Sequence, residues 1–269
     1  MTSGVRGWLA PGRASTAPIE DPAERRLIGT ELLVVFSVTL GLSALRSLLS
    51  LLDALVRPEP LQDQQVALNA PQAQADLIDL AFQLTRVLQL VAWGALAGYL
   101  LLRAGVRLRQ IGLDRSQPGR DAAGAAGLAL LIGVPGLALY LISYAAGLNL
   151  AVLPSTLGDS WWRVPVLVGS AIGNAWAEEV ILVGYLLTRL RQLGWTENRA
   201  LLVSALLRGA YHLYQGFGGF IGNFVMGLVF GRVWQRSGRL WMLVGAHALL
   251  DIVAFVGYAL LRGRVGWLP

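Results

Sequence analysis

Two adjacent glutamates, Glu178 and Glu179, interrupt an apolar run that reads NAWAEEVILVGYL over residues 174–186. Carboxylates this close repel each other, so they take up and release protons as a coupled pair. Burying both in an apolar segment is costly unless a charge partner, water or a bound ion accompanies them. A carboxylate held in such surroundings is a suitable general base for activating water.

The later apolar runs carry further ionisable side chains, among them the only two histidines of the chain. The stretch RGAYH places Arg208 four residues before His212, and HALLD places His247 four residues before Asp251. Each pair therefore shares one face of a helix. Neutral imidazoles can orient water, donate to an oxyanion or, together with carboxylates, hold a catalytic Zn²⁺ that keeps one open position. A zinc site built from Glu178, His212, His247 and Asp251 and a metal-free mechanism are both open.

The elements that must position these groups are membrane helices. The 269 residues are 55% hydrophobic and only 14% charged, and several windows of about 20 residues have almost no charge. We expect an all-α, polytopic transmembrane helix bundle of about seven to eight spans. The apolar segments cover residues 28–56, 77–102, 122–147, 164–188, 200–216, 217–235 and 240–261. Small-residue spacing at Gly169-x-x-x-Gly173, Gly218-x-x-x-Gly222 and Gly227-x-x-x-Gly231 indicates close helix packing.

The chain divides into a polar N-terminal tail (1–27), N-terminal transmembrane helices (28–160) and a catalytic helix bundle (161–262). All 22 basic residues are arginine, and their number alternates between high and low in successive loops, which predicts a cytoplasmic N-terminus. A role at the membrane surface explains the excess of basic over acidic residues. The sequence has no nucleic-acid-binding motif. Richness in arginine and alanine favours a bacterial plasma membrane protein. The lack of cysteine and lysine excludes disulfides, thiolate chemistry and Schiff-base chemistry.

The ionisable groups reach similar depths in their helices. Counted from the flanking Arg189, Arg199 and Arg239 at the helical rise, Glu178, His212, His247 and Asp251 lie ~12–20 Å from the same membrane surface. Unpaired, each would cost about 2.5–3.5 kcal/mol to insert. We therefore predict that they meet in one site near the middle of the membrane. The alternative is that these groups only hold the helices together through polar contacts. The large number of ionisable groups disfavours this alternative.

The order Glu-Glu, then His, then His-x-x-x-Asp on successive late helices resembles the CPBP family of intramembrane proteases, which includes CAAX prenyl proteases and lysostaphin-resistance-like proteins. The resemblance covers residues 160–262. It implies that Glu178 activates water with the help of His212, and that His247 and Asp251 bind the oxyanion or a metal.

Two positions depart from the family pattern. The first family motif is Glu-Glu-x-x-x-Arg, and Val183 stands at the arginine position. The second motif commonly has phenylalanine four residues before its histidine, where this chain has Arg208. We hypothesise that the positive charge has moved to a neighbouring helix, so that Arg208 compensates Glu179 across the helix interface.

The resulting function hypothesis is an intramembrane endopeptidase acting on a membrane-associated peptide or protein. Glu178, Glu179, Arg208, His212, His247 and Asp251 are its candidate catalytic residues. A proton- or metal-coupled transporter is one alternative, because mid-membrane histidines and carboxylates also form ion relays. A catalytically silent immunity or scaffold member of the same family is the other, because the motif arginine is missing.

Overall fold

The computed structural model describes residues 17–261. Most of the predicted polar tail lies outside these residues. The first helix begins at Pro22 rather than near residue 28, with Asp21 as its N-cap: the Asp21 side chain accepts a hydrogen bond from the Ala23 amide. A capping carboxylate followed by proline in the first turn is a common helix start.

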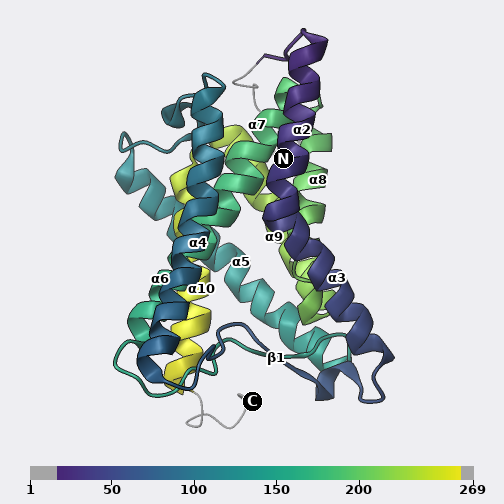
Figure 1. Cartoon of the computed structure of the whole chain (residues 1–269), viewed down its shortest axis with the longest axis vertical. Helices are drawn as coiled ribbons and strands as arrows, with labels where there is room; N and C mark the ends of the chain where they lie inside the picture. Colours follow the sequence, from purple (N-terminus) through teal and green to yellow (C-terminus); the bar gives the residue numbers. More distant parts are fainter. Residues whose placement is uncertain (1–16, 262–269) are drawn as a thin grey trace, which may run out of the picture.

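Helices account for nearly all the regular structure of the described residues (Figure 1). The α-helices are α2 (Pro22–Val38), α3 (Leu40–Val56), α4 (Asp76–Arg103), α5 (Pro118–Ala145), α6 (Arg163–Glu178), α7 (Leu187–Gln192), α8 (Glu197–Ala210), α9 (Phe217–Ser237) and α10 (Leu240–Leu261). A π-helical segment, η3 (Glu179–Leu186), joins α6 to α7 without a break. The 3₁₀ turns are η1 (Leu61–Asp63), η2 (Leu108–Ile111) and η4 (Leu213–Gln215). The predicted all-α class is confirmed.

The number of spans differs from the prediction. Within residues 17–261, five helices are long and apolar enough to cross a membrane, and a sixth is reached if α2 and α3 count as one bent span. Seven to eight spans are therefore not confirmed. The predicted helix over 200–216 ends at Ala210, so α8 has 14 residues, fewer than the roughly 20 that a bilayer core requires.

The first predicted segment is also not one straight helix. Helices α2 and α3 meet at Thr39 with a bend of 48°. The Thr39 hydroxyl donates to the Val35 carbonyl oxygen at 2.7 Å, a side-chain bond to the preceding turn of the kind that often bends helices. A Cβ added at Gly41 would lie 2.5 Å from the Phe36 carbonyl oxygen, so the bend also needs glycine there.

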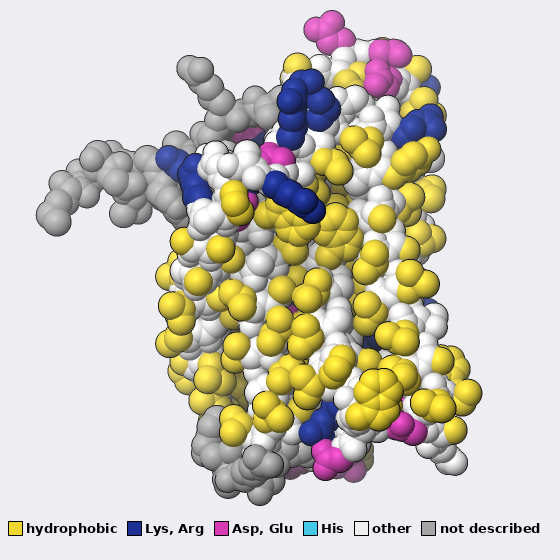
Figure 2. Space-filling view, turned by 90° about the vertical axis from the view of Figure 1, so that its left-hand side faces the viewer, with side chains coloured by type: hydrophobic (Ala, Val, Ile, Leu, Met, Phe, Trp, Pro, Cys, Tyr) yellow, Lys and Arg dark blue, Asp and Glu magenta, His cyan; other side chains and the backbone are white. Residues whose placement is uncertain are grey.

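The exterior of the bundle suits a bilayer. Figure 2 shows hydrophobic side chains over the middle of one face, with charged side chains gathered towards its two ends. In α5, Leu130, Leu131 and Val134 are each more than half exposed. Such a long apolar exterior is typical of an integral membrane protein.

The continuous helix Arg163–Gln192 is the most enclosed of the candidate spans. In its apolar window 67% of the residues are buried, compared with 22% in α4 and 11% in α5. Helices α4 and α10 pack against α6, and η3 also contacts both of them. The helix that carries the adjacent glutamates is therefore the core around which the others are arranged.

Glycines allow this close packing, as their spacing predicted. A Cβ at Gly227 would lie 2.9 Å from Ala205 Cα, and one at Gly231 would lie 2.4 Å from Leu201, so α9 approaches α8 through this pair. At the start of α9, Gly218 approaches Ser143 of α5 equally closely. Gly169 and Gly173 face α4 at looser distances.

Two short strands lie at the end of the bundle opposite the start of α2 (Figure 1). Strand β1 (Gln65–Ala67) pairs in parallel with β2 (Ala151–Leu153). The neighbouring Asn149 forms an isolated bridge with Gly216, whose φ of 106° favours glycine. The turn after α8, which carries His212, is therefore held by the loop before β2.

At the other end of the bundle, Arg239 ties the segment after η2 and the start of α5 to α10. Its guanidinium donates to Asp121 Oδ1 at 2.9 Å and to Asp121 Oδ2 at 2.5 Å, and also to Asp114 Oδ1 at 2.9 Å. The hydroxyl and amide of Ser116, followed by Arg239, lower the pKa of Asp114 from 3.8 to about 2. The folded state therefore favours the ionised Asp114 carboxylate.

We expect Arg239→Gln to lower the Tm of the detergent-solubilised protein by roughly 5–10 °C, because the nearly buried Asp121 loses its bidentate partner. Because the pKa of Asp114 is lower in the folded state, its ionised carboxylate stabilises the fold above pH 4. This stabilisation disappears as the pH falls towards 2. The Tm difference between variant and wild type should shrink over that range. Arg120→Gln, at an exposed arginine in the first turn of α5, is the control. An unchanged Tm at neutral pH would contradict this assignment.

Candidate active site

Glu178 and Glu179 lie at the point where the central helix changes from α to π geometry. Helix α6 ends at Glu178, and η3 begins at Glu179. π-Helical segments inside α-helices are rare and frequently occur at functional sites. Ser204 of α8 donates to the Leu182 carbonyl oxygen at 2.9 Å, and Thr188 donates to that of Gly184 at 2.6 Å. These hydroxyls satisfy carbonyl groups of the widened turns.

Glu179 contacts side chains from two other helices. Its Oε1 accepts from Arg208 Nη2 at 2.7 Å and from His247 Nδ1 at 2.7 Å. Arg208 comes from α8 and His247 from α10, so three helical elements meet at one oxygen. The Glu179 side chain is completely buried, and that of Arg208 is 1% exposed. The hypothesised compensation of Glu179 by Arg208 across the helix interface is thus observed.

Glu178 shares the same guanidinium but has a different environment. Arg208 Nη1 lies 3.4 Å from Glu178 Oε2, and the hydroxyl of Tyr211 donates to that oxygen at 2.5 Å. The Glu178 side chain is 13% exposed, whereas Glu179 has no exposure. Glu178 is therefore the glutamate that water or a substrate can reach.

His247 lies between the glutamates and Asp251. Because its Nδ1 donates to Glu179, its Nε2 faces Glu178 Oε2 at 4.0 Å and Asp251 Oδ2 at 3.8 Å. Asn174, one turn before Glu178, lies 3.4 Å from Asp251 and donates to it through Nδ2. Asp251 is the most exposed carboxylate of the group, at 21%. The open side of the site is thus bordered by Glu178 and Asp251.

His212 occupies the turn after α8 instead of the helix predicted for it. Its Nδ1 lies 3.0 Å from the Arg208 carbonyl oxygen. Because a carbonyl only accepts, Nδ1 carries the proton, and Nε2 is the free basic nitrogen of the neutral ring. The ring lies next to Tyr211 and Tyr214, with centroids at 4.6 Å and 6.4 Å. Among residues 17–261, His212 forms no hydrogen bond with either glutamate.

The four predicted metal ligands, Glu178, His212, His247 and Asp251, are not arranged as a ready-made metal site within residues 17–261. Within the described residues, no group of three or more His, Asp or Glu side chains is placed to hold a metal ion. The Nδ1 bonds of both histidines leave their Nε2 atoms free, as in metal-ligating histidines. The Arg208 guanidinium, however, lies beside Glu178, where it would repel a second cation. That charge disfavours a zinc ion bound to Glu178.

Sequence reasoning missed two polar partners, Tyr211 and Asn174. Tyr211 lies between Arg208 and His212 in RGAYH, and its hydroxyl donates to Glu178. Asn174 precedes Glu178 by one helical turn, a spacing that places both on one face. That spacing was a usable signal, whereas the bond from Tyr211 depends on where α8 ends.

We expect Arg208→Ala to destabilise the protein by roughly 3–5 kcal/mol, because Glu179 would keep its buried charge without a fixed partner. Thermal unfolding and the yield of folded protein measure this effect. In a Glu179→Gln background the same substitution should cost much less, since the buried charge is gone. A wild-type Tm for Arg208→Ala alone would show that the pair contributes nothing.

A double substitution can test whether an arginine on the central helix could neutralise Glu179 in place of Arg208. Val183→Arg combined with Arg208→Phe restores the two family motifs, and we expect it to recover part of the lost stability. Because Val183 is itself 1% exposed, recovery requires the new guanidinium to reach Glu179. Arg208→Phe alone is the reference variant.

Comparison with known proteins adds one finding. Neither a curated protein nor a solved structure matches the chain. A family model described as type II CAAX prenyl endopeptidase Rce1-like matches residues 160–253, which contain all six predicted site residues. This match confirms, over residues 160–253, the resemblance inferred from the three motifs.

Proposed function

We propose that this protein is an intramembrane endopeptidase that hydrolyses a membrane-associated peptide or protein with water activated by Glu178. The observation that carries the proposal is the unequal burial of the two glutamates. Glu179 is fully enclosed by Arg208 and His247, while Glu178 is partly exposed and held by Tyr211. A fixed, accessible carboxylate beside a histidine meets the requirements of a general base.

In the first step, Glu178 takes a proton from water as the water oxygen attacks the scissile carbonyl carbon. The free Nε2 of His212 assists by orienting this water. The carbonyl oxygen becomes an oxyanion, which His247 stabilises through Nε2–H when that ring is protonated. Asp251, fixed by Asn174, positions His247 for this contact.

In the second step, Glu178 returns the proton to the amide nitrogen, and the C–N bond breaks. The products are a carboxylic acid and an amine, so no nucleophilic side chain is consumed. Arg208 remains paired with both glutamates throughout. Its positive charge offsets the repulsion between the two adjacent carboxylates. The absence of arginine at position 183 is therefore no argument for a silent family member.

Glu178→Gln should reduce kcat by roughly 10²- to 10⁴-fold, because the amide cannot accept a proton. Its Tm should stay near the wild-type value, since glutamine still accepts from Tyr211. Cleavage of a membrane-peptide library by purified wild-type and variant protein measures the effect. Glu59→Gln, on the exposed loop after α3, is the matched control. Full cleavage by Glu178→Gln would end the general-base assignment.

We further propose that catalysis needs no metal. Incubation with 1,10-phenanthroline or EDTA followed by dialysis should leave library cleavage unchanged, and added Zn²⁺ should not increase it. Inactivation by chelator with recovery on Zn²⁺ addition would instead show that catalysis depends on a metal.

A further inference from the structure

A second cation in the membrane-spanning part of the bundle is not used by the site described above. Arg86 lies ten residues into α4, or ~15 Å from Asp76 along the helix. Its side chain is exposed, and its one hydrogen bond within the described residues is donated by Nη1 to the Leu68 carbonyl oxygen at 3.2 Å. No ion pair among those residues includes it. A guanidinium has five N–H donors, so most of its capacity is unused.

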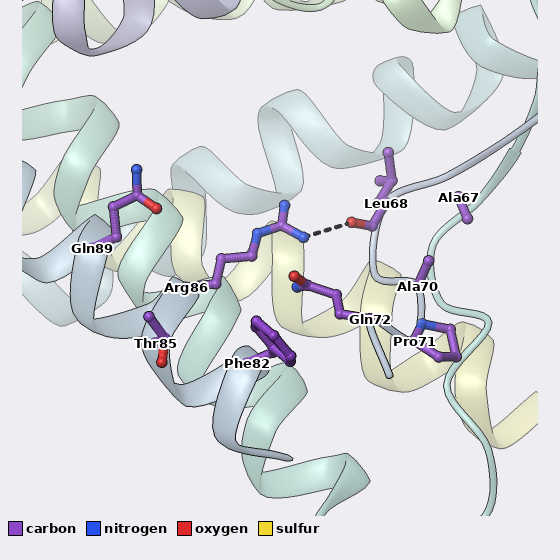
Figure 3. A pocket seen from close by; sticks show the side chains of 9 residues that line it. All are labelled: Ala67, Leu68, Ala70, Pro71, Gln72, Phe82, Thr85, Arg86 and Gln89. Carbon is purple, nitrogen blue, oxygen red and sulfur yellow. Dashed lines mark hydrogen bonds between the residues drawn. The ribbon is translucent and has the colours of Figure 1, made fainter. Parts of the chain in front are cut away.

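The guanidinium faces a pocket between α4 and the segment that follows β1 (Figure 3). The pocket has a volume of about 450 Å³. Thr85 and Gln89 line it from α4, and the Gln72 side chain extends into it from the facing segment. An uncompensated positive charge surrounded by neutral hydrogen-bonding groups is suited to an anionic ligand.

Along the bundle, this pocket lies ~14 Å from the level of Glu178. A Cβ at Gly169 of α6 would lie 3.8 Å from Val87, so Arg86 is level with that part of α6. Glu178 follows Gly169 by nine residues, which corresponds to ~14 Å along the helix. An extended peptide covers ~14 Å in about four residues.

We propose that the Arg86 pocket binds a carboxylate of the peptide substrate, about four residues from the bond that is cleaved. This inference rests on the proposed endopeptidase function. Arginine pairs with a carboxylate through two parallel hydrogen bonds, and Arg86 has the free donors to do so. Occupation by substrate would also supply the charge partner that Arg86 lacks in the membrane.

Binding can be tested without catalysis by using the Glu178→Gln protein in nanodiscs of neutral lipid. The probes are dye-labelled 20-residue alanine–leucine peptides that carry a single Asp, or Asn as its neutral counterpart, at successive positions. At the matching position the Asp peptide should bind about tenfold more tightly than the Asn peptide. Adding Arg86→Gln should remove this preference, and Arg86→Lys should keep only part of it.

Arg46→Gln is the matched control, because Arg46 is also an exposed arginine inside a helix and lines neither pocket. Persistence of the Asp preference in the Arg86→Gln protein would overturn the proposal. So would an Arg86→Gln effect confined to binding of a dye-labelled anionic lipid, since the site would then hold a headgroup. If the preference is lost as expected but wild-type protein cleaves none of the peptides, the endopeptidase function fails while the carboxylate site stands.

Discussion

The structure depends on neutralising one buried carboxylate, that of Glu179. Its Oε1 is shared by a guanidinium from α8 and an imidazole from α10. A charge buried without such partners costs several kcal/mol, so the three helices are held together where their polar groups meet. The same contacts orient the rest of the site. Arg208 presents its second nitrogen to Glu178, and His247 turns Nε2 towards Glu178 and Asp251.

The two neighbouring glutamates therefore have different tasks. Glu179 is enclosed and bonded on one oxygen, while its Oε2 is buried without a hydrogen-bond partner in the described part of the chain. Glu178 reaches the open side of the site together with Asp251. Three carboxylates therefore face one guanidinium and the imidazole of His247.

The sequence was sufficient to predict the class of fold, the meeting of Glu178, Glu179, Arg208, His247 and Asp251, and the Arg208–Glu179 pair. The pair was predictable because a charge missing at Val183 and a charge gained at Arg208 must balance in an apolar interior. The π-helical segment was not predictable, because residues 180–187 are almost uniformly apolar and have no periodicity to reveal a wider turn. The end of α8 was missed for a similar reason, since RGAYHLYQ has no proline and only one glycine before Gly216.

Moving the positive charge from the central helix to α8 couples charge compensation to helix docking. With 14 residues, α8 is the shortest of the helices that pack around the central one, and it lacks the length of an independent span. It is secured by the close approach of Gly227 to Ala205, by the Ser204 bond to the π-helical Leu182, and by the ion pair at Glu179. An arginine on the central helix would neutralise Glu179 whether or not α8 was in place. An arginine on α8 does so only after α8 has packed, and the same packing brings Tyr211 to Glu178 and sets the turn that carries His212. In this chain the site therefore acquires its charge balance and its candidate general base in a single assembly step.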